Sequence, residues 1–201
     1  MQIIKQNNLS IDHIVTALKE GKTIVYPTET CYGLGCDATN AEAVEKVFSI
    51  KQREEHKSVL IVVSDIEMAK RYVSWSPKIQ ELADKFWPGP LTIVADLVNG
   101  HDLAPGVIRG DGTIAFRVTE HSLVQELCQK LDQPIVSTSA NIAGHESPYN
   151  IGAVLSMFTN QTAQPDIIID GGELPFQSPS TIIRVMGDTI EVLRQGGIVV
   201  E

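Results

Sequence analysis

The chain has 201 residues, of which 43% are hydrophobic, and 16 basic against 25 acidic side chains give it a net charge of -9. This length and apolar content predict one globular domain with a full core, and the negative charge disfavours a surface that gathers a polyanion such as nucleic acid. Three cysteines, an N-terminus without signal-peptide character and no apolar run long enough to cross a bilayer predict a cytoplasmic protein with reduced thiols.

The first elements are expected around a glycine-rich stretch. Ser10 is a suitable N-cap for a helix over residues 11–21, because apolar side chains recur there at helical spacing and Gly21 can end it. A short buried strand is predicted over residues 23–26. The sequence YPTETCYGLGC, residues 26–36, follows at once, and we interpret it as the loop between this strand and the next helix.

The middle of the chain carries further start signals. Thr39 to Glu42 has the spacing of a capping box and predicts a helix that runs out near residues 49–58. The apolar run 59–63 predicts a strand covered on both faces, with Asp65 capping a short helix behind it. Ser76 followed by proline predicts a helix that continues through Phe86 and stops at WPGP.

The remainder alternates between strands and helices and then becomes mainly strands. Strands are predicted over 91–97, 113–118, 133–139, 166–170, 181–185 and 189–194, and helices over 122–131 and 150–158, while residues 98–112 are expected to form a polar loop. No repeat and no linker divides the chain. The pattern predicts an α/β fold, with residues 1–201 as a single domain built on a twisted mixed β-sheet with flanking helices.

The glycine-rich stretch has several possible uses. A metal at Cys31 and Cys36 would need more ligands, and the five histidines show no pair at ligand spacing, so we expect no structural metal. A catalytic thiol would need an imidazole partner, and two packed structural cysteines are the favoured interpretation. The sequence GLGCDA, residues 33–38, matches a loose dinucleotide fingerprint, but Asp37 would place a carboxylate near the pyrophosphate.

Other polar segments favour a small-molecule site. Lys51 and Arg53 in KQREEHK could both reach one phosphate chain, although a solvated charge run has the same composition. STSAN, residues 137–141, ends a strand, where open α/β sheets bind ligands. With a third polar loop at SPST, residues 178–181, these segments predict a cationic, hydroxyl-lined small-molecule site.

The same segments resemble those of a known family. YPTETCYGLGCDA, KQR with a downstream lysine, WPGPLT, FRVTEHSLV, STSAN and RQG occur in the order and at about the spacing found in the YrdC/TsaC threonylcarbamoyl-AMP synthases. The resemblance covers nearly the whole chain and is closest to the short single-domain form. KQREEHKSV departs from it, because it lacks the proline that many relatives carry after the arginine.

The resemblance also implies which residues act. It assigns a catalytic quartet to Lys51, Arg53, Ser139 and Asn141. It implies that threonine or nucleotide is contacted by a second set, namely Thr28, Thr30, Arg117, Ser137, Ser180, Thr181 and Arg194. In this interpretation Thr28, Glu29 and Thr30 matter in the glycine-rich stretch, and the cysteines do not take part.

The activity implied is a nucleotidyl transfer from ATP. Threonine and bicarbonate form a carbamate, which attacks the α-phosphorus of ATP and expels pyrophosphate, and the threonylcarbamoyl-AMP formed serves the threonylcarbamoyladenosine modification of transfer RNA. Lys51, Arg53, Arg194 and a bound Mg²⁺ are expected to stabilise the phosphoryl charge. The resemblance further implies that the TsaB/TsaD/TsaE machinery receives the product.

Two alternatives from other classes stay open at this point. One is an RNA-binding module, since some relatives are described as binding double-stranded RNA, and a weak RNA contact is compatible with the synthase as well. The other is a sister branch of the family with the same fold and unsettled activity. The net charge of -9 weighs against the first, and the complete quartet weighs against the second.

Overall fold

In the computed structural model, which describes residues 1–54 and 56–200, the strands join into one ten-stranded mixed sheet. The strand order is β1-β8-β2-β3-β7-β4-β6-β5-β9-β10. The strands of this part of the chain are β1 (Gln2–Lys5), β2 (Ile24–Pro27), β3 (Tyr32–Gly35), β4 (Leu60–Val63), β5 (Leu91–Asp96), β6 (Thr113–Val118), β7 (Ile135–Ser139), β8 (Ile167–Asp170), β9 (Thr181–Met186) and β10 (Thr189–Arg194). The predicted α/β fold with a mixed sheet is confirmed.

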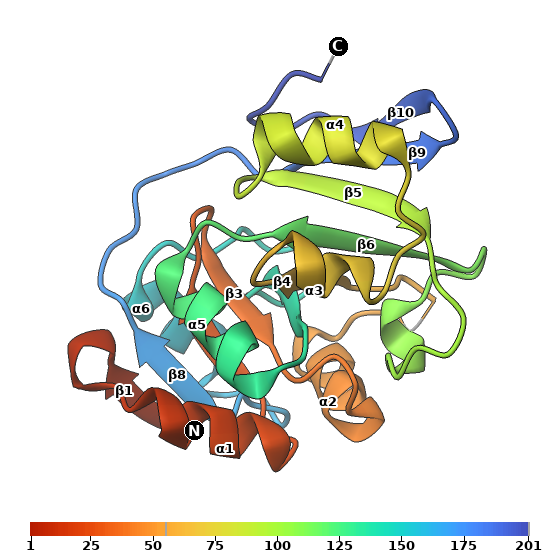
Figure 1. Cartoon of the computed structure of the whole chain (residues 1–201). Coiled ribbons are helices and arrows are strands. Elements are labelled where there is room, and N and C mark those ends of the chain that lie inside the picture. The colour runs from red at the N-terminus through yellow and green to blue at the C-terminus, as the bar shows by residue number, and fades with distance from the viewer. Residues whose placement is uncertain (55, 201) are drawn as a thin grey trace.

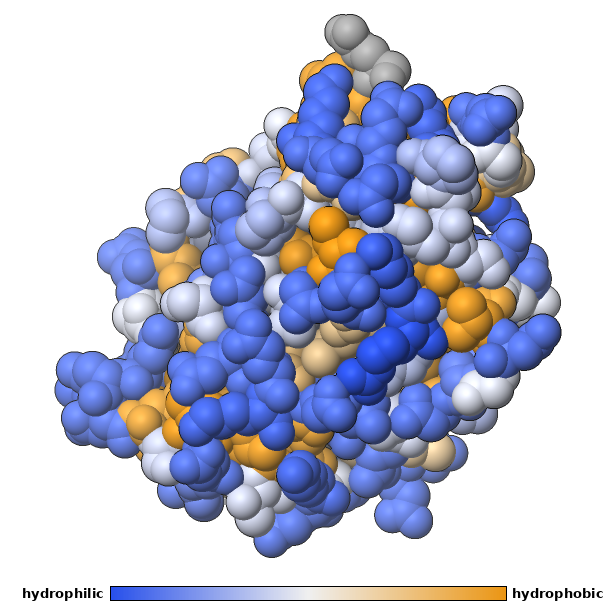
Figure 2. Space-filling view, viewed as in Figure 1, coloured by the Kyte–Doolittle hydropathy of each residue, from blue (hydrophilic) through white to orange (hydrophobic). Residues whose placement is uncertain are grey.

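Helices flank this sheet (Figure 1). They are α1 (Ile11–Lys19), α2 (Ala41–Lys51), α3 (Ile66–Lys70), α4 (Pro77–Phe86), α5 (Ser122–Leu131) and α6 (Ile151–Phe158), with short 3-10 turns η1 (Gln6–Asn8) and η2 (Pro105–Val107). Figure 1 shows α3, α4 and α5 in front of the sheet, and α1 packs against α5. Figure 2 shows that the outward face of this layer is mainly hydrophilic, with separate apolar patches. Over the residues described, none of the helices combines the length and apolar character that a membrane span requires.

Strand β7 joins the two halves of the sheet and positions the polar loop that follows it. It runs antiparallel to β3 on one side, pairing Ser139 with Gly33, and antiparallel to β4 on the other, pairing Ser137 with Leu60. The carboxyl end of β7 therefore lies between the glycine-rich hairpin and the strand that follows α2. This arrangement brings STSAN next to two of the other predicted polar segments.

Most local start signals act as the sequence predicts. Ser10 caps α1, Asp65 caps α3 and Ser76 caps α4, in each case by accepting a hydrogen bond from a backbone N–H of the first turn. Gly21 has a φ of 74° directly after the C-cap of α1, a conformation that glycine adopts without steric cost. These signals are local, so no tertiary contact is needed to interpret them.

Two local predictions are wrong. Residues 26–36 are not a strand-to-helix loop, because residues Tyr32–Gly35 form β3 and pair with β2 as a hairpin. Glycine has a low strand propensity, but Gly35 is required here, since a Cβ at this position would lie 1.8 Å from a backbone oxygen of β7. The N-cap of α2 is Asn40 and not Thr39, because the Asn40 side chain accepts from the N–H of Ala43. The Thr39 hydroxyl instead donates to Asp37.

Candidate functional site

A cavity of about 370 Å³ opens where the two halves of the sheet meet. Its wall comes from the β2–β3 turn, the segment after α2, the loops that lead to β6, α6 and β9, and strands β3 to β7, β9 and β10. The predicted site residues in this wall are Thr28, Thr30, Arg53, Arg117, Ser137, Ser139, Ser180 and Arg194. Residues far apart in the sequence thus share one site, which local sequence patterns cannot show.

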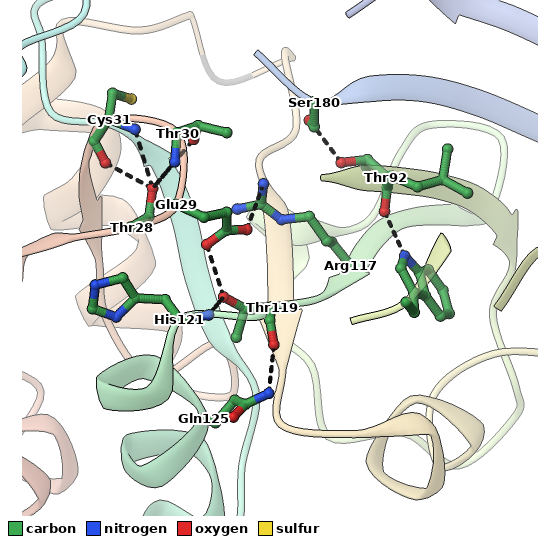
Figure 3. Close-up of polar contacts among 12 residues, drawn as sticks. Thr28, Glu29, Thr30, Cys31, Thr92, Arg117, Thr119, His121, Gln125 and Ser180 are labelled. Carbon is green, nitrogen blue, oxygen red and sulfur yellow. Dashed lines mark hydrogen bonds and ion pairs between the residues drawn. The ribbon is translucent and has the colours of Figure 1, made fainter. Parts of the chain in front are cut away.

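The hydroxyl of Thr28 organises the turn between β2 and β3 (Figure 3). It donates to the backbone oxygen of Cys31 at 2.7 Å and accepts from the backbone N–H groups of Thr30 and Cys31 at 3.2 and 3.3 Å. Side-chain hydrogen bonds of this kind favour turns. The Thr28 hydroxyl is therefore largely used in building the turn that presents Thr30 and Cys31 to the cavity.

Three members of the predicted quartet form one hydrogen-bonded cluster behind the cavity wall. The Lys51 Nζ donates to the backbone oxygens of Ser139 and Asn141 at 2.6 and 2.9 Å and to the Asn141 Oδ1 at 2.9 Å. The Ser139 hydroxyl also donates to this Oδ1, at 2.6 Å, and the Asn141 amide donates to the His145 carbonyl. Lys51 and Asn141 are buried and only Ser139 of the three lines the cavity, so the cluster sets the shape of the STSAN loop.

The surroundings of Lys51 disfavour the charged form of its amino group. Burial is the main effect and the Arg53 charge the second, and together they lower the pKa of Lys51 to about 8. A shift of this kind marks a candidate functional residue, although structural clusters produce it as well.

Arg53, the fourth member of the quartet, lies at the cavity wall itself. Its Nε donates to the backbone oxygen of Lys57 at 2.7 Å and its Nη2 donates to that of Ser58 at 3.0 Å. These bonds hold one edge of the guanidinium against the segment that leads to β4. Burial lowers the pKa of Arg53, because it removes part of the water that would solvate the guanidinium charge.

Arg117 reaches the cavity from β6 and is backed by a buried carboxylate (Figure 3). The Arg117 Nη1 lies 3.0 Å from the Glu29 Oε1, and the two side chains are 5% and 7% exposed. This contact has the distance of an ion pair without the angles of a hydrogen bond, since Glu29 Oε1 has no hydrogen-bond partner in the described structure. The other carboxylate oxygen accepts from the Thr119 hydroxyl at 3.0 Å. Glu29 therefore lies between Arg117 and Thr119.

Arg194, the last residue of β10, is another predicted cation that lines the cavity. Its Nε and Nη2 donate to the backbone oxygen of Ser180 at 3.1 and 2.7 Å, and the Nη2 also donates to the Ser180 hydroxyl at 3.0 Å. Thr92 supports Ser180 from β5 through a 2.9 Å hydrogen bond between the two hydroxyls. Burial, and next the nearby Arg117 charge, lower the pKa of Arg194. Two arginines on different strands thus face the same space.

Thr181 lies apart from the cavity wall. Its hydroxyl accepts from the backbone N–H groups of Gly196 and Ile198 at 3.0 and 3.2 Å and donates to the Ile198 oxygen at 2.5 Å. These bonds tie the chain after β10 back to the start of β9. The Thr181 hydroxyl is thus used in hydrogen bonds within the protein. A substrate contact at Thr181 stays a prediction.

The structure adds wall residues that the sequence did not indicate. They include Ser58, Arg109, Ser147, Tyr149 and Gln177. Arg109 belongs to the 98–112 segment, whose position no local pattern predicts. Within the described residues its Nε is buried without a hydrogen-bond partner, and it lies 3.9 Å from the Asp111 carboxylate. Arg109 and Arg53 also border a second hollow of about 330 Å³, whose wall includes His56 and Lys57.

The wall suits anions and does not offer a resident metal site. Its described residues include four arginines and several hydroxyls but no aspartate or glutamate. Mg²⁺ is usually held by one or two carboxylates together with substrate phosphates, and the described residues contain no cluster of three or more potential metal ligands. The residues present therefore do not fit a Mg²⁺ ion held by the protein alone.

The cysteines show no sign of activation. Burial raises the pKa of Cys31 at the cavity wall, and it raises that of Cys36 in the core. It also raises the pKa of Cys128 to about 12. Because the thiolate is the reactive form, these shifts oppose a nucleophilic role. The class of protein defined so far is an α/β fold with an anion-binding, hydroxyl-lined cavity for a small molecule.

Comparison with known proteins identifies the family. The Sua5/YciO/YrdC family, described as "Telomere recombination", matches residues 16–196. A threonylcarbamoyl-AMP synthase of Pseudoalteromonas atlantica is 40% identical over 166 residues, which cover 81% of this chain and 85% of that protein. The chain therefore belongs to the Sua5/YciO/YrdC family, as the sequence motifs predicted.

Solved structures agree with this assignment. P. abyssi Sua5 complexed with L-threonine has a TM-score of 0.86 and 31% identity, with 98% of this chain and 57% of that chain covered. E. coli YciO has a TM-score of 0.83 and 26% identity, with 97% of this chain and 94% of that chain covered. The chain thus spans little more than half the length of the Sua5 protein and nearly all of YciO.

Proposed function

We propose that this protein is a threonylcarbamoyl-AMP synthase that converts L-threonine, bicarbonate and ATP into threonylcarbamoyl-AMP and pyrophosphate. Relatives named threonylcarbamoyl-AMP synthase are 32% to 40% identical to it, and the structurally similar P. abyssi Sua5 was solved with L-threonine. The observation that carries the proposal is the cavity in which four arginines and a set of hydroxyls converge. This is the lining that two anionic substrates require.

The reaction needs no nucleophile from the protein. The threonine nitrogen attacks the carbon of carbon dioxide derived from bicarbonate and loses a proton to give a carbamate; if it attacks bicarbonate directly, a C–O bond breaks and water leaves. A carbamate oxygen then attacks the α-phosphorus of ATP, and the bond to the β-phosphate oxygen breaks to release pyrophosphate. The protein has to hold two anions together and offset the charge on the phosphoryl group. The mixed anhydride that forms hydrolyses readily, so the site must exclude bulk water.

In our proposal, different wall residues bind the threonine-derived carbamate and the phosphates of ATP. Arg117 and Arg194 offset the carboxylate and carbamate charges, and Thr30 and Ser137 supply neutral hydrogen bonds. Arg53 and Arg109 face the phosphates, and the second hollow that they border offers space for the departing pyrophosphate. Lys51 acts as a positioning residue, because its three hydrogen bonds hold the loop that carries Ser139 and Asn141.

Mg²⁺ enters this proposal as part of the nucleotide substrate. The wall has no carboxylate among its described residues, so a Mg²⁺ ion would reach the site bound to the ATP phosphates.

The RNA-binding alternative is less well supported. Its phosphate contacts would need cations spread over an exposed face, whereas the net charge is -9 and the wall arginines converge on a cavity of about 370 Å³. The sister-branch alternative is disfavoured by the 40% identity to a protein named as a synthase. We also propose that residues 1–201 are one YrdC-like domain, that the protein works in the cytoplasm and that its labile product passes to the TsaB/TsaD/TsaE machinery. The continuous sheet supports the first of these proposals.

The direct test is to incubate the pure protein with ATP, threonine and bicarbonate and to measure pyrophosphate and the adenylate. Both products should require all three substrates, because the nucleophile is the adduct of threonine and bicarbonate. Pyrophosphate release at full rate without threonine, or with carbon dioxide rigorously excluded, would contradict the mechanism.

A mutational test addresses the site. Arg53→Ala should lower turnover by about 10²-fold or more, the cost of losing one charge-stabilising donor. Arg53→Lys should also be poor, because a planar fork becomes a point charge. Lys85→Ala is the matched control, since Lys85 lies in the last turn of α4 and is exposed. Unchanged turnover in Arg53→Ala, together with weaker binding of double-stranded RNA, would favour the RNA-binding alternative.

A further inference from the structure

An aromatic pair lies at the rim of the cavity, outside the residues that the proposed reaction uses. The rings of Tyr149 and Phe176 have centroids 5.3 Å apart and planes inclined at 43°. Tyr149 lines the cavity, as does Gln177, the neighbour of Phe176. Phe176 is 78% exposed, so most of a large apolar ring faces water. Exposure of this extent at the mouth of a cavity suggests a surface that a ligand covers.

The two segments that carry this pair contribute no charged side chain to the cavity wall. The residues that the loop before α6 and the segment 171–180 contribute are Ser147, Tyr149, Gln177, Pro179 and Ser180. All arginines of the described wall come from other parts of the chain. ATP has the same division, since its phosphates are charged and its purine is flat and uncharged. The base therefore fits the uncharged part of the wall, where aromatic faces are available.

Both loops that carry the pair are fastened to one strand residue. Tyr32 of β3 donates its backbone N–H to the Pro148 oxygen at 3.0 Å. Its hydroxyl accepts from the Gly171 N–H at 2.9 Å and donates to the Gly172 oxygen at 2.7 Å. Tyr32 is fully buried, so both loops share a rigid anchor.

Two further hydrogen bonds link the loops to each other. The Leu174 N–H donates to the Tyr149 backbone oxygen at 2.7 Å, and the Tyr149 hydroxyl donates to the Gln177 oxygen at 3.4 Å. Figure 1 shows the segment between β8 and β9 running along the outside of the sheet from one half to the other. The pair is therefore held in place before any ligand binds, which reduces the ordering cost of binding.

We propose that Tyr149 and Phe176 form a stacking platform for the adenine base of the nucleotide, a proposal that rests on the synthase function above. Every base has a π-face, and the loss of an aromatic partner in stacking weakens binding by about 5-fold or more per base. The platform holds the base at the uncharged rim while the phosphates extend toward Arg53 and Arg109. It determines affinity for the nucleoside part and takes no part in the chemical step.

The test compares a ligand that has the base with one that lacks it. Direct binding of AMP and of inorganic tripolyphosphate is measured by calorimetry for the wild type, Phe176→Ala and Phe176→Trp. Phe176→Ala should bind AMP about 5-fold or more weakly with the affinity for tripolyphosphate unchanged, and Phe176→Trp should retain the affinity for AMP. Met186→Ala, at an apolar side chain that is 50% exposed on β9, is the control and should change neither affinity.

A second variant tests the anchor. Tyr32→Phe keeps the ring and removes both hydroxyl hydrogen bonds to the segment 171–180, so it should weaken AMP and leave tripolyphosphate unchanged. Unchanged AMP affinity in Phe176→Ala, or equal losses for AMP and tripolyphosphate, would overturn the platform. Absence of AMP binding to the wild type would also overturn it.

Failure of the platform and failure of the proposed function can be told apart. The binding measurements need no turnover, whereas the synthase is tested by pyrophosphate release with threonine and bicarbonate. A wild-type protein that binds AMP with the predicted pattern and releases no pyrophosphate would refute the synthase and support the platform. Normal synthesis with an unchanged Phe176→Ala affinity for AMP would do the opposite.

Discussion

Removal of the carboxylate behind Arg117 should destabilise the fold strongly. In Glu29→Ala the guanidinium keeps its charge in a site where it is 5% exposed, and its Nε has no hydrogen-bond partner in the described structure. Breaking a buried ion pair by removing one partner costs about 3–5 kcal/mol, because the other charge stays buried and uncompensated. For a chain of 201 residues this corresponds to a fall in Tm of roughly 6–20 °C.

The assay is equilibrium unfolding in urea, followed by circular dichroism and fluorescence. Glu29→Gln removes the negative charge but keeps the hydrogen bond, since the amide oxygen can still accept from the Thr119 hydroxyl. It should therefore lower the free energy of unfolding by less than Glu29→Ala does. The double variant Glu29→Leu with Arg117→Met should cost clearly less than the sum of the two single changes, because it leaves no unpaired charge.

The result that would refute this reasoning is a small effect. A loss below about 1 kcal/mol in Glu29→Ala is the value typical of an exposed pair, and it would mean that water reaches Arg117 freely. Additive effects in the double variant would show that Glu29 and Arg117 contribute independently. Either outcome would remove the basis for describing Glu29 as the carboxylate that compensates the buried charge of Arg117.

Three further predictions follow from burial. Folding lowers the pKa of Lys51 from 10.5 to about 8, so the folded state binds fewer protons than the unfolded state between these two pH values. The free energy of unfolding should therefore rise with pH across this window. Lys51→Met should remove this contribution to the pH dependence, as measured by urea unfolding at a series of pH values. The double change of Cys31 and Cys36 to serine should keep turnover within a few-fold and cost on the order of 1–2 kcal/mol, whereas complete loss of activity in the folded protein would revive a thiol mechanism. Gly35→Ala should cost more than about 3 kcal/mol or prevent folding, because its Cβ would lie 1.8 Å from a backbone oxygen, and Gly110→Ala, with nothing within 4 Å, should be near neutral by thermal unfolding.

Local signals in the sequence identified most helices and strands. The caps at Ser10, Asp65 and Ser76 act through backbone groups only three residues away, so the information needed to place them is contained in the segment itself. Helix α5 was likewise predicted from the spacing of its apolar residues, and strand β4 from its run of apolar residues. One cap was misplaced although its contacts are equally local: the hydroxyl of Thr39 donates to Asp37, two residues away, and Asn40 is the N-cap of α2.

The site was predicted as a set of residues but not as an arrangement. The motifs predicted a cationic, hydroxyl-rich site, and most of the predicted residues line one cavity. Arg109 was missed because it lies in a segment without periodicity. The separate places of Lys51, behind the wall, and Arg53, on it, could not be predicted either. Lys51 is the last residue of α2 and Arg53 follows the left-handed C-cap Gln52, and no local pattern shows which of the two the loop after β7 covers.

The residue order alone thus determines the α/β class and the family, and it predicts the chemical character of the site. These inferences depend on local periodicity and on short motifs, each of which can be recognised without the others. The tertiary structure decides which strands are neighbours, and its clearest example is the glycine-rich segment that opens the site. Gly33 and Gly35 have poor strand propensity, yet both lie in β3, and at Gly35 β7 approaches too closely for a side chain. That close approach brings the loop after β7 beside the β2–β3 turn, and a contact between residues about a hundred positions apart is not encoded in either segment by itself.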